Sequence, residues 1–408
     1  MNKNEVYKLG YGFALGNSLD VNTTDGPKSK DIYWETGWGN NIIDSNLIKS
    51  IKNRGFKTIK VPISWEDHMQ YSDDYTSGEC DDWWCTRCKQ VVQMILDEGL
   101  YCIINTQHDS DWIRSINDPV LDNSRKETIV NKFRTLWKII SNIFKDFDKD
   151  KLFYESMNEV GFSKPNSKYF VDLCNSFIEE CRNTDQDNNR LLILSGVYCD
   201  TNTTLQQFPI DSVINDDNYV LSLHLYTPGS FTLANNILDK ISDISVADNI
   251  REGNAEITYY DGDYLGNNYG DESYTDNYGT EVLIKNYNHD ELAEALGNIE
   301  KIESVYNTKV IISEFGCNPF FRDKDAVYDW FKQVTVYCQE RKMPLVLWNN
   351  GNKFQCIIRK TMQDRRSIDM EKIIGNYNNT VFKEELSESY RSDADDFTNQ
   401  LDIDRSLV

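Results

Sequence analysis

The sequence is poor in positive charge and has no long apolar run. It contains 43 Lys and Arg against 66 Asp and Glu, which gives a formal net charge of −23. Such a charge repels phosphates and all but excludes nucleic acid as a partner. No stretch of eighteen apolar residues is present, which argues against a membrane span. A neutral or cationic substrate is easier to accommodate, and a neutral sugar polymer fits.

Signatures of several other protein classes are also missing. No Gly-rich phosphate loop follows the first apolar run, which disfavours a nucleotide-binding fold. The sequence shows no repeats at solenoid periods. Cys80, Cys85 and Cys88 cluster, but no fourth ligand of matching spacing is near, so zinc is not expected. We therefore expect neither a metal nor a cofactor.

The ten cysteines are better explained by disulfides in an oxidising compartment. Cys174 and Cys181 are two helical turns apart and are not expected to pair with each other. Three Asn-x-Ser/Thr sequons, at positions 22, 202 and 378, are compatible with secretion. We therefore expect an extracellular protein. Because no signal peptide follows Met1, we expect a mature or trimmed chain.

Eight short apolar runs divide the chain, and segments with helical periodicity separate most of them. Each run is typical of a buried β-strand, because it is rich in β-branched or aromatic residues and ends at polar residues or Gly. The runs cover residues 11–16, 58–65, 101–108, 152–159, 191–196, 219–226, 309–316 and 344–348. Two doubly wound domains would alternate in the same way but should show a composition break near mid-chain, and none is present. The pattern predicts an α/β fold, a single (β/α)8 TIM barrel.

The predicted barrel domain covers 1–380, and 381–408 reads as an acidic, weakly periodic tail. Two long insertions, at about 66–82 and 229–288, follow the second and sixth strands. They therefore belong to the face that carries the active site in such barrels. The centre of the second insertion is rich in Tyr, Gly, Asn and Asp. Three interpretations of this insertion remain open: a solvated excursion, a wall of the substrate cleft, or a docking surface for another protein.

Two glutamates mark the predicted catalytic face. Glu159 ends the fourth run and Glu314 lies near the end of the seventh. A Glu near a strand end is more often a surface residue, so the prediction depends on both falling at the same end of one barrel. Two carboxylates about 5 Å apart can hydrolyse a glycosidic bond with retention, one as acid/base and one as nucleophile. His224 and Tyr226 share one face of the sixth run and could reach the same site.

Short motifs recur in a fixed order along the chain. They are Gly12-Phe-Ala-Leu-Gly-Asn-Ser-Leu-Asp20, Glu35-Thr-Gly-Trp-Gly-Asn40, residues 55–65, Ile103-Ile-Asn-Thr-Gln-His-Asp109, Met157-Asn-Glu159, His224-Leu-Tyr226, Ile312-Ser-Glu-Phe-Gly316 and Trp348-Asn-Asn-Gly351. With these motifs the chain resembles glycoside hydrolase family 5, and most closely its endo-β-1,4-glucanases and xyloglucanases. Each motif is short, but the ordered set is specific and spans about residues 9–375.

The resemblance implies a role for each residue of the catalytic centre. Glu159 would be the acid/base, and Asn158 would contact the 2-hydroxyl of the sugar at the cleavage point. Glu314 would be the nucleophile, hydrogen-bonded by Tyr226. His224 would line the same site near the acid/base.

The resemblance also implies a substrate-binding cleft. Trp348 would form the floor on which the sugar stacks. Trp38 and Trp112 are further stacking platforms, less securely matched. Asn17, at the end of the first run, belongs to the same substrate-binding face.

Of the departures from the family pattern, two matter most. Lys60 stands where the family has an Arg that braces the nucleophile, so the charge is kept but the planar fork is lost. Gln107 stands where the family usually has a His, and it cannot titrate. His108 is adjacent, but one step along a strand points to the opposite face, so it does not simply substitute. Asn349 replaces the Asp of the family's usual Trp-Asp-Asn-Gly.

Two functions remain open at this point. The first is a retaining endo-β-1,4-glucanase that acts on cellulose, mixed-linkage glucan or xyloglucan. The alternative is a catalytically impaired barrel that binds polysaccharide or serves as a structural module, and Lys60 and Gln107 are its motivation. In either case the expected partner is a β-glucan, and other modules or a scaffold protein of a larger cellulolytic assembly would be compatible with it.

Overall fold

The computed structural model of the chain describes residues 1–23, 30–233, 255–259, 280–284, 286–318, 324–351 and 354. The chain divides into two compact units. The first comprises Met1–Leu225, Asp290–Phe315 and Lys342–Asn350, and the second comprises Tyr226–His289, Gly316–Arg341 and Gly351–Val408. All strands of the central barrel belong to the first unit.

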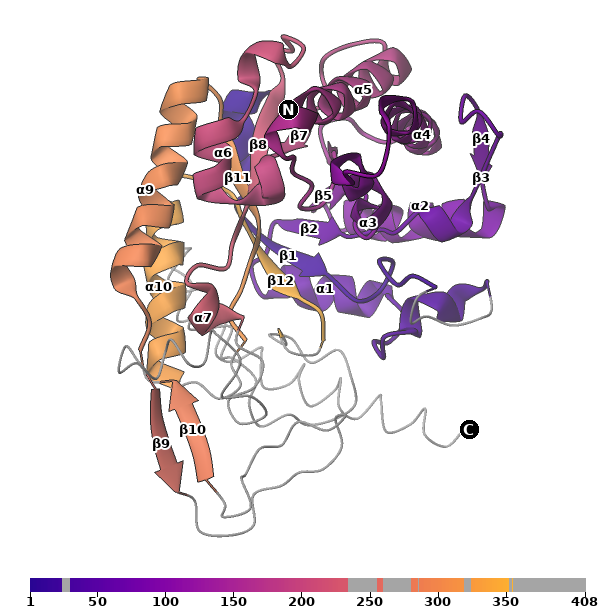
Figure 1. Cartoon of the computed structure of the whole chain (residues 1–408). Coiled ribbons are helices and arrows are strands. Elements are labelled where there is room, and N and C mark those ends of the chain that lie inside the picture. Colours follow the sequence, from indigo (N-terminus) through magenta and orange to yellow (C-terminus); the bar gives the residue numbers. More distant parts are fainter. Residues whose placement is uncertain are drawn as a thin grey trace. The chain divides into compact units, whose positions relative to one another are not determined.

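Eight parallel strands form a closed barrel in the order β1-β12-β11-β8-β7-β6-β5-β2 (Figure 1). They are β1 (Tyr11–Leu15), β2 (Thr58–Val61), β5 (Tyr101–Ile104), β6 (Leu152–Glu155), β7 (Leu192–Ser195), β8 (Tyr219–Leu225), β11 (Val310–Phe315) and β12 (Leu345–Asn349). Closure is made by the first and last strands, where Tyr11 pairs with Leu345. The predicted TIM barrel is confirmed.

Each barrel strand begins within one residue of its predicted start, because every apolar run is buried on both faces. Their inward side chains meet in one core cluster that also contains Met1, Val6 and Leu9. Val6 and Leu9 come from η1 (Lys3–Leu9), a 3₁₀ helix that precedes β1. This N-terminal segment therefore adds apolar side chains to the barrel core.

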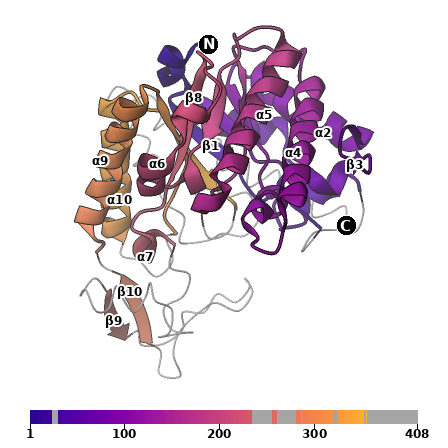
Figure 2. The same ribbon diagram turned by 45° about the horizontal axis from the view of Figure 1, so that its top comes forward.

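Helices of the first unit lie outside the strands, and α4 and α5 lie side by side (Figures 1 and 2). The helices are α1 (Ser45–Asn53), α2 (Asp82–Asp97), α3 (Ser110–Ile113), α4 (Asn123–Ile143), α5 (Ser167–Asp185), α6 (Thr201–Gln207) and α9 (His289–Tyr306). The sequence signals for α1 are typical. Asp44 caps its first turn by accepting from the Leu47 amide, and Gly55 follows it with a φ of 88°.

The first insertion is more regular than predicted. Within 66–82 it forms the 3₁₀ helix η3 (Glu66–His68) and an antiparallel pair, β3 (Met69–Tyr71) and β4 (Gly78–Cys80). Gly78 is required there, because a Cβ would lie 2.7 Å from the Gln70 carbonyl oxygen.

The second unit contains α7 (Gly229–Thr232), α10 (Lys324–Glu340) and the antiparallel pair β9 (Ala255–Tyr259) and β10 (Thr280–Ile284). The predicted insertion at 229–288 is thus described only in part. Its Tyr-rich centre beyond residue 259 and the predicted tail at 381–408 lie outside the described residues. On α10, Trp330, Val334 and Cys338 are buried at helical spacing.

The disulfide prediction is not confirmed. Free thiols are found at Cys80, Cys85, Cys88, Cys102, Cys174, Cys181, Cys199 and Cys338. No helix among the described residues is both long enough and apolar enough to cross a bilayer.

Candidate active site

The two predicted catalytic glutamates occupy different kinds of backbone. Glu159 lies in the turn after β6, four residues past the strand's end at Glu155, with a φ of 50°. Glu314 lies within β11, at a register shift between Ile312 and Glu314. Such a bulge turns the strand locally. It explains why Ser313 and Glu314, consecutive residues, both reach groups inside the barrel.

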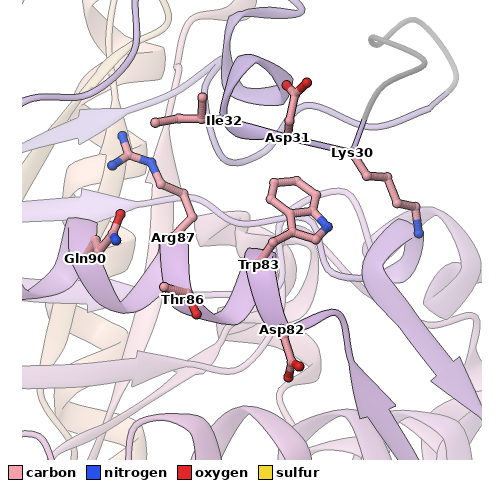
Figure 3. Close-up of a pocket in the computed structure, with 8 residues that line it drawn as sticks. All are labelled: Lys30, Asp31, Ile32, Asp82, Trp83, Thr86, Arg87 and Gln90. Carbon is pink, nitrogen blue, oxygen red and sulfur yellow. The ribbon is translucent and has the colours of Figure 1, made fainter.

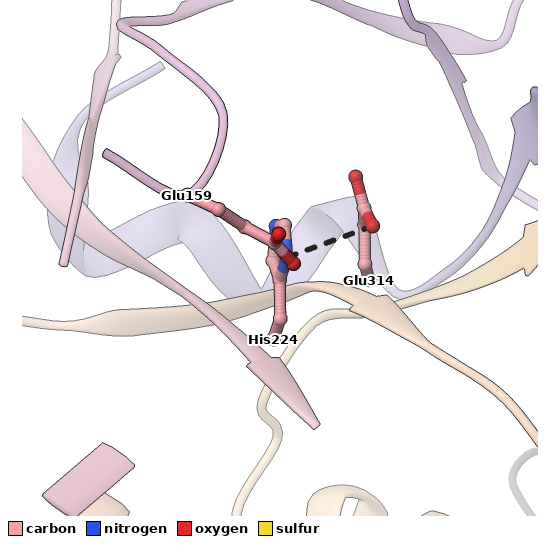
Figure 4. A group of neighbouring side chains, drawn as sticks. All are labelled: Glu159, His224 and Glu314. Carbon is pink, nitrogen blue, oxygen red and sulfur yellow. Dashed lines mark hydrogen bonds and ion pairs between the residues drawn. The ribbon is translucent and has the colours of Figure 1, made fainter. Parts of the chain in front are cut away.

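The two carboxylates meet at His224, which projects from β8 (Figure 4). The His224 Nδ1 atom is 2.8 Å from Glu159 Oε1 and 3.5 Å from Glu314 Oε2. One ring nitrogen of His224 and one carboxylate oxygen of each glutamate lie within 4.8 Å of one another. The Glu159 side chain is 40% exposed and that of Glu314 only 5%. One carboxylate is therefore open to solvent, whereas the other is shielded.

The neighbouring charges determine whether His224 or Glu159 carries the proton that the two side chains share. Burial disfavours a charged His224, but contact with Cys199 and the carboxylates of Glu314 and Glu159 outweighs it and raises the His224 pKa well above its usual value. Burial likewise opposes ionisation of Glu159, yet the hydrogen bond from His224 and the nearby Arg114 charge lower its pKa. The shared proton therefore lies on the imidazole. The spacing alone would also admit a cation, but a protonated imidazole donates hydrogen bonds and does not ligate metals.

Lys60, on β2, forms an ion pair with Glu314. Its Nζ atom lies 3.1 Å from Glu314 Oε1 and 2.6 Å from Glu155 Oε2, and the side chain has no exposed surface. Burial alone would neutralise the ammonium, but the Glu155 and Glu314 charges outweigh it and raise its pKa. Lys60 is therefore a cation at the position where the sequence predicts loss of a bidentate brace.

Gln107 reaches the same carboxylate more weakly. Its Nε2 atom is 3.5 Å from Glu314 Oε1, while its Oε1 accepts a hydrogen bond of 2.6 Å from Asn105. Asn158 is buried, and its Oδ1 accepts no hydrogen bond from the residues that the structure describes. A buried acceptor of this kind normally has a partner. Asn158 thus offers an acceptor beside Glu159 that a ligand hydroxyl could fill.

His108 does not substitute for the missing His, but the predicted reason is wrong. β5 ends at Ile104, so the alternation of a strand does not extend to Gln107 and His108. His108 turns instead to Asp20, 3.8 Å away, and its ring meets the Trp38 ring edge-on at 5.2 Å. Burial opposes its charge, but the Asp20 contact raises its pKa.

The predicted stacking residues lie near the C-terminal ends of barrel strands or in the segments that follow these ends. Trp348, on β12, is half-buried, and Gly16 leaves the space for its ring. Asn17 follows Gly16 with a φ of 56°, and its amide donates to Asp20 Oδ2. Trp112 is partly covered, because the Lys132 ammonium lies 4.3 Å from its ring centroid.

Tyr226 is the first residue of the second unit and directly follows β8. Within its own unit its ring meets that of Phe354 at 5.7 Å. Its predicted hydrogen bond to the nucleophile stays a prediction.

Sequence reasoning missed several residues that contact this cluster. Arg114 donates to the Glu159 carbonyl oxygen at 3.2 Å and lies 3.7 Å from its carboxylate. Glu155 shares the Lys60 ammonium with Glu314 and accepts a hydrogen bond of 2.5 Å from the Ser222 hydroxyl. Glu155 carried a signal, since it is a charged residue inside an apolar run. Ser222 carried none.

A pocket lies away from these residues. It is a pocket of about 500 Å³ between the loop before η2 (Ile32–Thr36), with the start of η2, and the first turns of α2 (Figure 3). Its lining residues are Lys30, Asp31, Ile32, Asp82, Trp83, Thr86, Arg87 and Gln90. The buried Arg87 holds the two sides together through Glu35, at 2.7 Å. None of the predicted catalytic or substrate-binding residues lines this pocket.

Comparisons with known proteins point to one family. Endoglucanase A of Clostridium longisporum is 30% identical over 241 residues, which cover 56% of this chain and 44% of that protein. Endoglucanase A of Ruminococcus albus is 30% identical over 238 residues, covering 56% and 61%. The chain therefore spans only about half the length of these curated relatives.

Solved structures share the fold. A GH5-4 broad specificity endoglucanase from Clostridium longisporum superimposes with a TM-score of 0.69 at 22% identity, over 93% of this chain and 99% of that one. A Bacteroides ovatus GH5 xyloglucanase in complex with a XXXG heptasaccharide gives 0.68 at 21%, over 91% and 75%. The model of the family described as cellulase (glycosyl hydrolase family 5) matches residues 20–354. Because this match covers most of the chain, the protein belongs to glycosyl hydrolase family 5.

Proposed function

We propose that this protein is a retaining endo-β-1,4-glucanase that hydrolyses a plant cell-wall β-glucan: cellulose, mixed-linkage glucan or xyloglucan. The observation that carries the proposal is the separation of the Glu159 and Glu314 carboxylates, whose nearer oxygens lie within 4.8 Å. Retaining glycosidases hold their two carboxyls about 5 Å apart, whereas inverting enzymes need about 6.5–9.5 Å to admit a water. The xyloglucanase and endoglucanases among the relatives support this class of substrate.

In the first step the Glu314 carboxylate attacks the anomeric carbon, and the bond to the leaving oxygen breaks. Glu159 protonates that oxygen, and the proton comes from the His224–Glu159 pair. In the second step Glu159 takes a proton from water, and the resulting hydroxide displaces Glu314 from the sugar. The exposure of Glu159 suits it to meet both the leaving group and the water, and the shielding of Glu314 suits a covalent intermediate.

The remaining residues would bind and orient the sugar. Asn158 Oδ1 would accept from the 2-hydroxyl, and the Trp348 ring would stack against the sugar face. Trp38 and His108 would extend the cleft from the β1 and β5 loops. A polymer of this kind lies outside cells, so the proposal carries with it an extracellular place of action.

The alternative, a barrel that binds glucan without cleaving it, rests on Lys60 and Gln107. Both side chains contact Glu314 in the structure, so neither departure leaves the nucleophile unbraced. The contacts therefore favour the hydrolase.

Paired variants test the proposal. Glu314→Gln should abolish turnover of soluble β-glucans and of an aryl β-cellobioside. Glu159→Gln should abolish glucan turnover but keep a burst of about one nitrophenol per active site, because that group leaves without a proton and only the second step then lacks its base. ¹H NMR of fresh product should show the β-anomer. Unchanged turnover in Glu314→Gln, or an α-anomer as first product, would refute the mechanism.

A further inference from the structure

A third carboxylate is buried below the catalytic pair, and the double displacement has no use for it. Glu155 ends β6 and is 1% exposed. A buried carboxylate is costly unless it has a cation and hydrogen-bond donors. Glu155 has both, since Lys60 lies 2.6 Å from Oε2 and the Ser222 hydroxyl 2.5 Å from Oε1.

The ammonium of Lys60 is held by three oxygen atoms, one through an ion pair and two through hydrogen bonds. An ammonium has three N–H donors and no fixed plane, so its direction is set by the groups it binds. Here those groups are Glu155 Oε2 at 2.6 Å, Glu314 Oε1 at 3.1 Å and the Ser313 carbonyl oxygen at 3.5 Å. Glu155 makes the shortest of these contacts, and the other two both lie on β11 at the nucleophile.

A second path from Glu155 also leads to the nucleophile. Ser222 must donate its single hydroxyl proton to Glu155, because an ionised carboxylate only accepts. The Ser222 and Ser313 hydroxyl oxygens are 2.5 Å apart, so Ser313 is the donor in that bond. Ser313 is the residue at the β11 register shift and immediately precedes Glu314. Glu155 thus orients Glu314 through its neighbour as well as through Lys60.

We propose that Glu155 is a positioning residue for the reaction: it anchors the Lys60 ammonium and the Ser222–Ser313 hydroxyl chain, and thereby fixes the Glu314 carboxylate toward the sugar. This inference rests on the proposed function. It explains how Lys can occupy the place of a bidentate Arg, since a second carboxylate supplies the directionality that the side chain lacks.

A double-mutant cycle tests the anchoring. Glu155→Gln and Lys60→Met should each lower kcat on a soluble glucan by about 10- to 100-fold, because a displacement of about 1 Å at a catalytic group costs about 100-fold. KM should change less than about twofold. In the Lys60→Met background, Glu155→Gln should lower kcat by less than it does in wild type, since only the Ser222–Ser313 hydroxyl chain is then left for Glu155 to hold. Losses that multiply would overturn the proposal.

The pH profile separates positioning from a merely structural role. The titratable groups around Glu314 are Lys60 on β2, Glu155 on β6, His224 on β8 and Glu159 in the turn after β6. In Glu155→Gln, Glu314 alone would balance the Lys60 charge, so the acid limb of kcat/KM should move to lower pH. In Lys60→Met it should move to higher pH. An unmoved acid limb in both variants would contradict the proposal.

Asp185→Asn is the matched control. Asp185 pairs with Arg190 in an equally buried ion pair, 2.9 Å long, that has no contact with the catalytic residues. This variant should lower the Tm and leave both the acid limb and the kcat of the folded enzyme unchanged. A shift of the acid limb in Asp185→Asn would show that any lost ion pair produces the effect, and would overturn the inference.

Failure of the proposed function has a different outcome. If wild type turns over no β-glucan, that function is rejected, and crystal structures of wild type and Glu155→Gln decide the anchoring. The proposal expects the Glu314 carboxylate and Lys60 Nζ to move in the variant. Unmoved groups would overturn it.

Discussion

Gly16 provides the sharpest test of the cleft, because a single methyl group there would collide with the proposed sugar platform. A Cβ at Gly16 would lie 2.8 Å from Trp348 Cζ2 and 3.1 Å from the Asn349 carbonyl oxygen. Ordinary contact begins at 3.4 Å, so the Trp348 ring must retreat by at least 0.6 Å. If about 1 Å of misplacement costs about 100-fold, Gly16→Ala should lower kcat/KM by about 10-fold.

The assay is steady-state hydrolysis of a soluble glucan beside a thermal melt. Gly297→Ala is the control, because nothing lies within 4 Å of the added methyl group. Gly297 lies within α9, so this variant should gain up to about 1 kcal/mol of stability and keep wild-type kinetics.

The background of Trp348→Ala isolates the ring. Without the indole, the methyl group at Gly16 has lost its main obstacle, so Gly16→Ala should cost little more there. A full 10-fold loss in the Trp348→Ala background would refute the argument, because it would place the damage in the backbone rather than in the ring.

Two further predictions concern protons. His68 is fully buried against the rings of Trp34 and Trp84. Neither nitrogen of its imidazole has a hydrogen-bond partner among the described residues, and burial lowers the His68 pKa to about 4. As the pH falls, His68 is protonated in the unfolded chain before it is protonated in the folded protein. The free energy of unfolding should therefore decrease by about 3 kcal/mol between about pH 6.5 and about pH 4. His68→Phe should remove that share of acid sensitivity in urea unfolding at pH 7 and 4.5, and an unchanged difference would contradict it. His224→Asn should move the basic limb of kcat/KM to lower pH, because the raised pKa of His224 keeps the shared proton available to Glu159; a pH–rate series in which that limb stays put would disprove proton sharing.

The barrel could be predicted from the sequence because burial on both faces produces apolar runs that a reader can count. The ends of the strands could not. The runs at 58–65, 101–108 and 152–159 overshoot the ladders by four residues each, because a buried loop residue looks the same as a buried strand residue. This overshoot of the strand ends matters at Gln107 and His108, because the alternation of side chains does not continue beyond the end of β5.

The site was predictable only as far as its polar residues stood out from apolar surroundings. Glu159, His224 and Glu314 were found in this way, and the structure brings them together. The Glu155–Lys60 pair joins residues 95 positions apart, and the β11 bulge at Ser313 depends on neighbours from two other strands. Such features arise from the closed barrel and leave no local pattern.

The two departures from the family pattern have different consequences for charge. At Lys60 the positive charge survives, and what changes is the number of groups needed to direct it; Glu155 meets that need. At Gln107 the titratable ring of the family's usual His is lost, and the amide that replaces it cannot titrate. His224, which contacts both Glu159 and Glu314, remains as a group that can hold a proton there. The basic limb of the pH profile should accordingly follow the His224 imidazole, and the orientation of Glu314 should follow the buried carboxylate of Glu155.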